Sequence, residues 1–107
     1  MLTIEEHTLT LLMEECGEAI QRASKQMRFG KDEVQPGQSE SNAARLRFEL
    51  NDVLVCIQML EDLGEIPFVD NVGIGQHRAS KRAKVARMME LSKSLGRLEA
   101  CSLSAGD

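Results

Sequence analysis

The sequence contains no tryptophan and no tyrosine, and only three phenylalanines among its 107 residues. The 13 basic residues are also outnumbered by 17 acidic ones, which gives a formal net charge of −4. Proteins that bind DNA or RNA strands neutralise phosphates with basic surfaces and stack bases on aromatic side chains. A chain that is acidic overall and short of aromatic residues is therefore a poor candidate for binding a nucleic-acid polymer.

Cysteine is scarce too, with Cys16, Cys56 and Cys101 in no CxxC or zinc-ligand spacing. Three isolated cysteines indicate reduced thiols that pack as small apolar side chains. No apolar stretch approaches the roughly 20 residues that span a bilayer, and the N-terminus lacks a basic region followed by an apolar run. We therefore expect a cytoplasmic protein that makes no contact with a membrane.

Apolar residues recur at intervals of three and four, which is typical of amphipathic helices, and no strong alternating strand pattern is present. The first helix is predicted over residues 4–29. Thr3 and Glu6 have capping-box spacing at its start, and Gly30 ends it. Its predicted apolar stripe consists of Leu9, Leu12, Met13, Cys16, Ile20, Ala23 and Met27.

The second helix follows a turn-rich loop, and Ser41 or Asn42 caps it while Gly64 ends it. It is apolar on most sides, so it needs more cover than the other helices of one small chain can supply. A third helix is predicted over residues 78–98, after a connector over residues 65–76. The expected fold is an all-α helical bundle with a single domain over residues 1–98, a flexible tail over residues 99–107, and a core completed by oligomerisation.

Two acidic pairs interrupt the apolar pattern of the first two helices. Glu15 and Glu18 lie in the first helix, and Glu49 and Asp52 lie in the second. A spacing of three places both carboxylates of a pair on the same side of a helix. If the pairs face each other, the acids must protonate, reach solvent or hold a cation.

Only oxygen ligands are available at these positions, because neither histidine lies near them. Carboxylate-only sites favour hard cations such as Mg²⁺ or Mn²⁺. The Glu-x-x-His motifs of ferritin-like di-iron proteins are missing. Two plainer interpretations stay open: Glu18 and Arg22 form a solvated ion pair, and the basic cluster at residues 81–87 is a solvated helix face rather than a phosphate-binding one.

The motif Glu15-x-x-Glu18, followed by a loop and Glu49-x-x-Asp52, resembles the MazG-like all-α nucleoside triphosphate pyrophosphohydrolases. Three segments look like a bacterial and phage branch of that superfamily: SKQMRFG at residues 24–30, NAARLRFELND at 42–52 and KRAKVAR at 81–87. The likeness extends from about residue 9 to about residue 92.

This resemblance implies hydrolysis of a nucleoside triphosphate between its α and β phosphates, giving a monophosphate and pyrophosphate. It also implies that the two acidic pairs bind Mg²⁺, with Mn²⁺ as a substitute, and that the protein forms a homodimer or a dimer of dimers. The roles that it implies for single residues are Glu14 and Glu15 in catalysis, Glu15, Glu18, Glu49 and Asp52 as metal ligands, and Lys25, Arg28, Lys84 and Arg87 as phosphate-binding residues.

Two other functions fit the same sequence. The chain is alternatively a helical module that binds a nucleotide or a metal without chemistry, or an interaction protein whose acidic pairs are only salt-bridged. Release of pyrophosphate separates the enzyme from the binding module. An effect of Mg²⁺ or Mn²⁺ on the melting temperature separates both from the interaction protein, because a ligand that binds only the folded state stabilises it.

Overall fold

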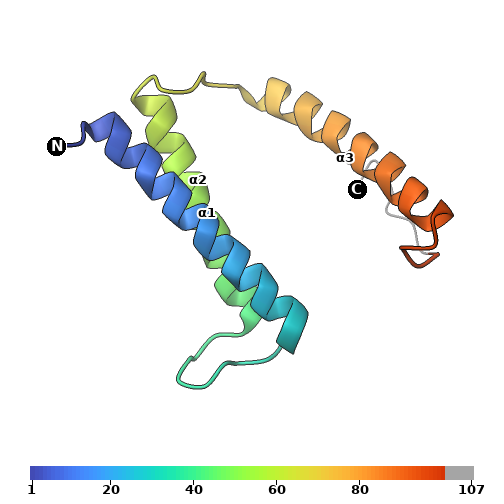
Figure 1. Cartoon of the computed structure of the whole chain (residues 1–107). Coiled ribbons are helices and arrows are strands. Elements are labelled where there is room, and N and C mark those ends of the chain that lie inside the picture. Colours follow the sequence, from blue (N-terminus) through green and yellow to red (C-terminus); the bar gives the residue numbers. More distant parts are fainter. Residues whose placement is uncertain (101–107) are drawn as a thin grey trace. The chain divides into compact units, whose positions relative to one another are not determined.

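The computed structural model describes residues 1–100, which form α-helices and no strand (Figure 1). Helix α1 spans Ile4–Phe29, α2 spans Asn42–Asp62 and α3 spans Asn71–Ser94. The predicted all-α class is therefore confirmed. Cys101 and most of the predicted tail lie outside the described residues. Within residues 1–100, no helix has the length and apolar character needed to cross a membrane.

The predicted bounds of α1 are confirmed, because local signals fix both of its ends. Thr3 Oγ1 accepts a hydrogen bond of 3.1 Å from the Glu6 backbone N–H. Glu6 Oε1 in turn accepts one of 3.1 Å from the Thr3 backbone N–H, which completes a capping box. Hydrogen bonding to the carboxylate by the Thr3 backbone N–H, and by the Thr3 side chain, lowers the pKa of Glu6. At the other end Gly30 adopts a φ of +93°, a conformation that favours glycine.

Helix α2 begins at a serine cap, as predicted. Ser41 Oγ accepts a hydrogen bond of 3.2 Å from the Ala44 backbone N–H. The side chain of Asn42 is buried and donates a hydrogen bond of 2.8 Å to the Gly30 carbonyl. Asn42 thereby joins the end of α1 to the start of α2. The helix ends just before Gly64, whose φ is +74°.

Helices α1 and α2 lie side by side and run in opposite directions (Figure 1). The face of α1 that is shielded differs from the predicted apolar stripe. Thr8 is buried, and its hydroxyl donates a hydrogen bond of 2.8 Å to the Ile4 carbonyl, which satisfies it. The partly shielded positions that follow it along α1 are Leu11, Leu12, Glu15, Glu18, Ala19, Arg22, Lys25 and Gln26. This set forms one helical face, and of the predicted stripe it includes only Leu12.

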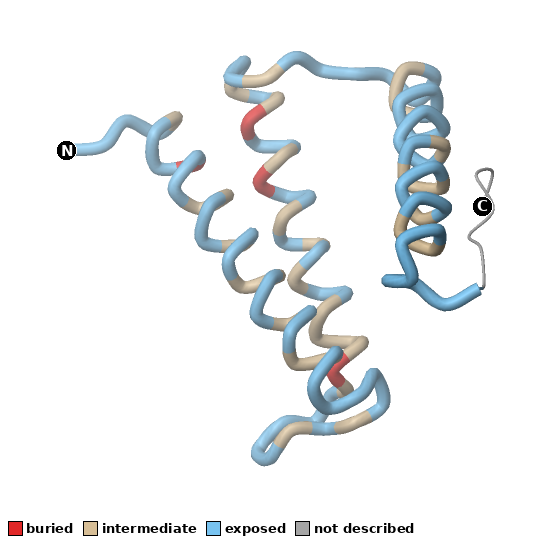
Figure 2. Tube along the Cα trace, turned by 45° about the vertical axis from the view of Figure 1, so that its right-hand side comes forward, coloured by how far each residue is buried: buried red, intermediate tan, exposed pale blue. Residues whose placement is uncertain are grey.

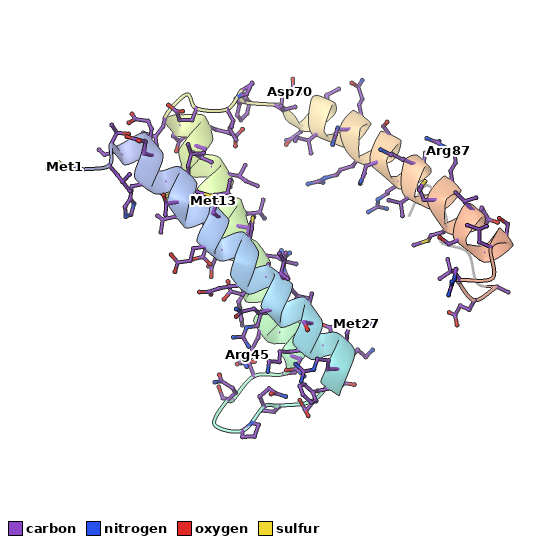
Figure 3. All side chains as sticks on the ribbon, viewed as in Figure 1. Met1, Met13, Met27, Arg45, Asp70 and Arg87 are labelled. Atoms are coloured by element: carbon purple, nitrogen blue, oxygen red, sulfur yellow. The ribbon has the colours of Figure 1, made fainter. Side chains whose placement is uncertain are left out.

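The rest of the predicted stripe is exposed in the single chain. Met13 and Met27, both labelled in Figure 3, are 66% and 87% exposed. The side of α2 that carries Phe48, Val55 and Met59 is exposed as well. Among the described residues only two apolar side chains, Cys56 and Leu60, are buried. Figure 2 shows how few positions along either helix are buried. Within one chain, much of the apolar surface of α2 therefore stays exposed.

The predicted start of the third helix is wrong, because α3 begins at Asn71 rather than Arg78. Asp70 caps it, with Oδ1 accepting a hydrogen bond of 2.8 Å from the Gly73 backbone N–H. Gly73 is suited to the first turn, since a Cβ there would lie 2.8 Å from Val69 Cγ1. The second half of the predicted connector is thus helical. The helix also ends earlier than expected, at Ser94, before Gly96 with its φ of +71°.

The chain divides into two compact units, one over Met1–Pro67 and one that begins at Phe68. The first unit contains α1, α2 and the loop between them. Helix α3 belongs to the second unit. All of the predicted acidic site residues lie in the first unit.

Candidate metal centre

Three carboxylates converge where α1 and α2 face each other. Glu15, Glu18 and Glu49 each offer one oxygen, and these three oxygens lie within 4.8 Å of one another. Glu15 and Glu18 come from successive turns of α1, and Glu49 comes from α2. All three side chains are half-buried. The antiparallel packing of the two helices therefore joins members of both predicted acidic pairs.

Two carboxylate oxygens in this group are shielded from solvent and lack a hydrogen-bond partner. They are Oε2 of Glu15 and Oε2 of Glu49. A buried polar atom without a partner is costly, and a buried carboxylate more so. A proton or a cation bound between the helices would therefore stabilise this arrangement.

The surroundings of Glu49 raise the pKa of its carboxyl. Burial raises the pKa of its carboxyl from 4.5 to about 7. Hydrogen bonding of the protonated form to Glu18 and Glu15, and the negative charge of both neighbours, act in the same direction. Near neutral pH the Glu49 carboxyl is therefore partly protonated when no cation is bound.

The other predicted acids stand apart from this group. Asp52 lies about one turn after Glu49 on α2, is exposed and is not a member of the triad. Glu14 precedes Glu15 and is exposed too. The structure thus brings together three of the four predicted metal ligands and leaves Glu14 and Asp52 at the surface.

Cys56 lies buried on α2, close to the acidic group. Its burial raises the pKa of the thiol, and the charges of Glu15 and Asp52 raise it further. The thiol is therefore protonated at neutral pH and poorly suited to bind a metal. Cys16 and Cys56 are both free thiols, as predicted.

The donor set fits a hard divalent cation. Three carboxylates supply only oxygen ligands, and Mg²⁺ usually keeps several waters and shares its coordination with substrate phosphates. A cation between the helices would also pair with the two oxygens that lack a partner.

A pocket lies further along α1, and it collects basic side chains. Its volume is about 490 Å³, and its lining consists of Ile20, Gln21, Arg22, Ser24, Lys25 and Arg28. No acidic residue belongs to that lining. None of its three basic residues has an ion-pair partner among residues 1–100. Lys25 is seven residues after Glu18 and thus on nearly the same side of the helix, about 10 Å further along its axis.

The pocket agrees with the predicted roles of Lys25 and Arg28 in position, and it adds Arg22. Sequence reasoning treated Arg22 only as a solvated partner of Glu18, but no such ion pair forms in the described part of the chain. The repeat of basic residues at 22, 25 and 28 was the available signal. Lys84 and Arg87 are exposed on α3, in the second unit (Figure 3).

No family model matches the chain, and neither a curated protein nor a solved structure matches it. The resemblance to MazG-like enzymes therefore rests on the sequence motifs alone.

Proposed function

We propose that the protein is a MazG-like, Mg²⁺-dependent nucleoside triphosphate pyrophosphohydrolase that releases pyrophosphate and a nucleoside monophosphate. One observation carries the proposal. Oxygens of Glu15, Glu18 and Glu49 gather within 4.8 Å of one another, at positions where the sequence motifs place metal ligands. The two oxygens without a partner support the presence of a cation in the working protein.

Glu15, Glu18 and Glu49 would hold the metal, with Asp52 as the fourth ligand that the resemblance implies. When bound, Mg²⁺ neutralises charge on phosphate oxygens and lowers the pKa of a bound water. Lys25 and Arg28, together with Arg22, would bind the phosphate oxygens from the pocket along α1. Glu14, exposed beside the triad, is the proposed group that orients the attacking water or takes its proton.

The basic residues of α3 enter the proposal only through the resemblance. Lys84 and Arg87 are exposed and lie in a helix whose first two thirds carry no acidic residue. The role that the resemblance implies for both residues is phosphate binding.

We also propose that the working protein is a homodimer or a dimer of dimers. The described part of the chain buries only Cys56 and Leu60 among its apolar residues. Large apolar side chains remain exposed on both helices of the first unit, and contiguous exposed apolar surface usually marks an interface. A second copy of the chain would cover this surface.

The test is pyrophosphate release from a panel of canonical and modified nucleoside triphosphates, with Mg²⁺, with Mn²⁺ and with chelator. Metal-dependent release of pyrophosphate together with the monophosphate is expected for at least one substrate. Glu49→Ala should abolish that release, whereas Glu40→Ala, which removes an exposed carboxylate from the loop, should retain it. Equal turnover by both variants would show that the assigned site is wrong. Binding of triphosphates without turnover would instead indicate a binding module.

A further inference from the structure

The ring of Phe29, the last residue of α1, lies against two of the basic side chains that line the pocket. Lys25 Nζ is 5.6 Å from the ring centroid, and the guanidinium carbon of Arg28 is 4.9 Å from it. Both distances fall within the roughly 6 Å over which a cation is attracted by an aromatic face. One ring therefore contacts two cations of the same pocket.

Such a contact has a clear physical role, because these two cations otherwise lack a fixed partner. Neither Lys25 nor Arg28 forms an ion pair among residues 1–100. Both are long, flexible side chains, and like charges three residues apart on a helix repel each other. An aromatic ring that attracts both cations offsets part of that repulsion and restricts their rotamers. The two side chains then lose less conformational entropy when a ligand binds to both cations.

We propose that Phe29 is a positioning residue that holds Lys25 and Arg28 ready to bind the phosphate groups of a polyphosphate. This inference rests on the proposed function for its natural substrate, a nucleoside triphosphate. It assigns Phe29 a role through the two cations and no contact with the reacting atoms. It differs from a role in stacking on a nucleobase, in which the ring itself would contact the ligand.

Inorganic tripolyphosphate is a suitable probe, because it carries the phosphates and no base. Its binding is measured by calorimetry, and the turnover of a nucleoside triphosphate is measured beside it. The variants are Phe29→Leu, which removes the ring, Phe29→Tyr, which keeps it, and Phe68→Leu as the matched control. Phe68 is exposed, and its ring contacts no cation in the described part of the chain. Far-ultraviolet circular dichroism verifies that each variant is folded.

Phe29→Leu should weaken tripolyphosphate binding about two- to fivefold, the change that a cation–π contact at an exposed site supports. KM for the nucleotide should rise by a similar factor while kcat changes little, because the lost interaction serves ground state and transition state alike. Phe29→Tyr should restore the affinity of the unaltered protein. Phe68→Leu should behave like the unaltered protein.

A double-mutant cycle separates positioning from general stability. In a background in which Lys25→Gln and Arg28→Gln are both present, Phe29→Leu should have no further effect on tripolyphosphate binding. An undiminished effect in that background would overturn the proposal. So would a loss of nucleotide affinity with unchanged tripolyphosphate affinity, since that result indicates base stacking. If Phe29→Leu fails to fold, loss of affinity in the folded Phe29→Tyr variant would overturn the proposal as well.

These outcomes are distinct from failure of the proposed function. If the unaltered protein binds tripolyphosphate but releases no pyrophosphate from any nucleotide, the enzymatic proposal fails and the Phe29 variants still test the inference. If the unaltered protein binds no tripolyphosphate, the inference fails, whatever the turnover.

Discussion

One carboxylate oxygen of Glu49 on α2 lies within 4.8 Å of one from Glu15 on α1, although 34 residues separate them in the sequence. Each of these side chains also has a shielded Oε2 without a hydrogen-bond partner. The pair thus concentrates negative charge between two helices that bury few apolar groups. The stability of the hairpin should therefore depend on how that charge is neutralised.

The first prediction concerns pH in the absence of metal. The pKa of Glu49 is about 7 in the folded chain, against 4.5 for the free group. Between these values the folded protein binds the proton more tightly than the unfolded chain, so the free energy of unfolding should fall as the pH rises from about 4.5 to about 7. Glu49→Gln removes the ionisable group and should lack this fall. Urea unfolding across this pH range, in the presence of chelator, measures the difference.

In that experiment Glu49→Gln should be more stable than the unaltered protein at pH 8 and similar to it near pH 4.5. Glu14→Gln is the control, because it neutralises an exposed carboxylate next to the triad. Parallel pH profiles for Glu49→Gln and the unaltered protein would contradict the prediction.

The second prediction is that Mg²⁺ stabilises the folded chain and that its effect needs Glu49. A cation that binds only the folded state adds about 2.7 kcal/mol at a concentration 100 times Kd. The melting temperature should therefore rise with added Mg²⁺ at pH 8 and rise less at pH 5, where Glu49 holds its proton. Glu49→Gln should remove most of the rise, while Glu40→Gln should leave it unchanged. Equal shifts in both variants would mean that Mg²⁺ binds elsewhere.

The third prediction concerns the residue that joins the two helices. Asn42 is 2% exposed and donates hydrogen bonds of 2.8 Å to the Gly30 carbonyl and 3.2 Å to Glu33 Oε1. Asn42→Ala leaves both acceptors without this donor, so we expect a loss of about 1–3 kcal/mol in the free energy of unfolding. Urea unfolding measures it. Gln38→Ala, at an exposed position of the same loop, should cost far less, and an equal cost would argue against the anchoring role of Asn42.

The ends of α1 and the start of α2 could be predicted because they depend on neighbours in the sequence. Thr3 with Glu6 forms a capping box, and Ser41 caps the next helix. The start of α3 also depends on neighbours in the sequence, but the prediction placed it at Arg78 instead of Asn71. Gly73 and Gly75 disfavour a helix in this segment, whereas the cap at Asp70 and the close approach of Gly73 to Val69 favour one.

The packing face of α1 could not be predicted from periodicity alone. Its most apolar stripe stays largely exposed, and the shielded face contains Thr8, Glu15 and Glu18. The spacing of the acids showed which carboxylates share a side of a helix, and this is why Glu15 and Glu18 were found. It could not show that Glu49 meets them while Asp52 stays exposed, because that depends on the register and rotation of α2 against α1.

The last prediction tests whether a second copy covers the exposed apolar side of α2. Val55 is 51% exposed and shares that side with Phe48 and Met59. Val55→Glu would place a charge inside the proposed interface, where desolvation without a partner is costly. Sizing with light scattering should show an oligomer for the unaltered protein and a shift toward monomer for Val55→Glu. Gln38→Glu adds the same charge at an exposed position of the loop between α1 and α2 and should stay oligomeric. A folded monomer of the unaltered protein at micromolar concentration would refute self-association. Dissociation of both variants alike would show that the added charge, rather than its place on the apolar side of α2, causes the oligomer to dissociate.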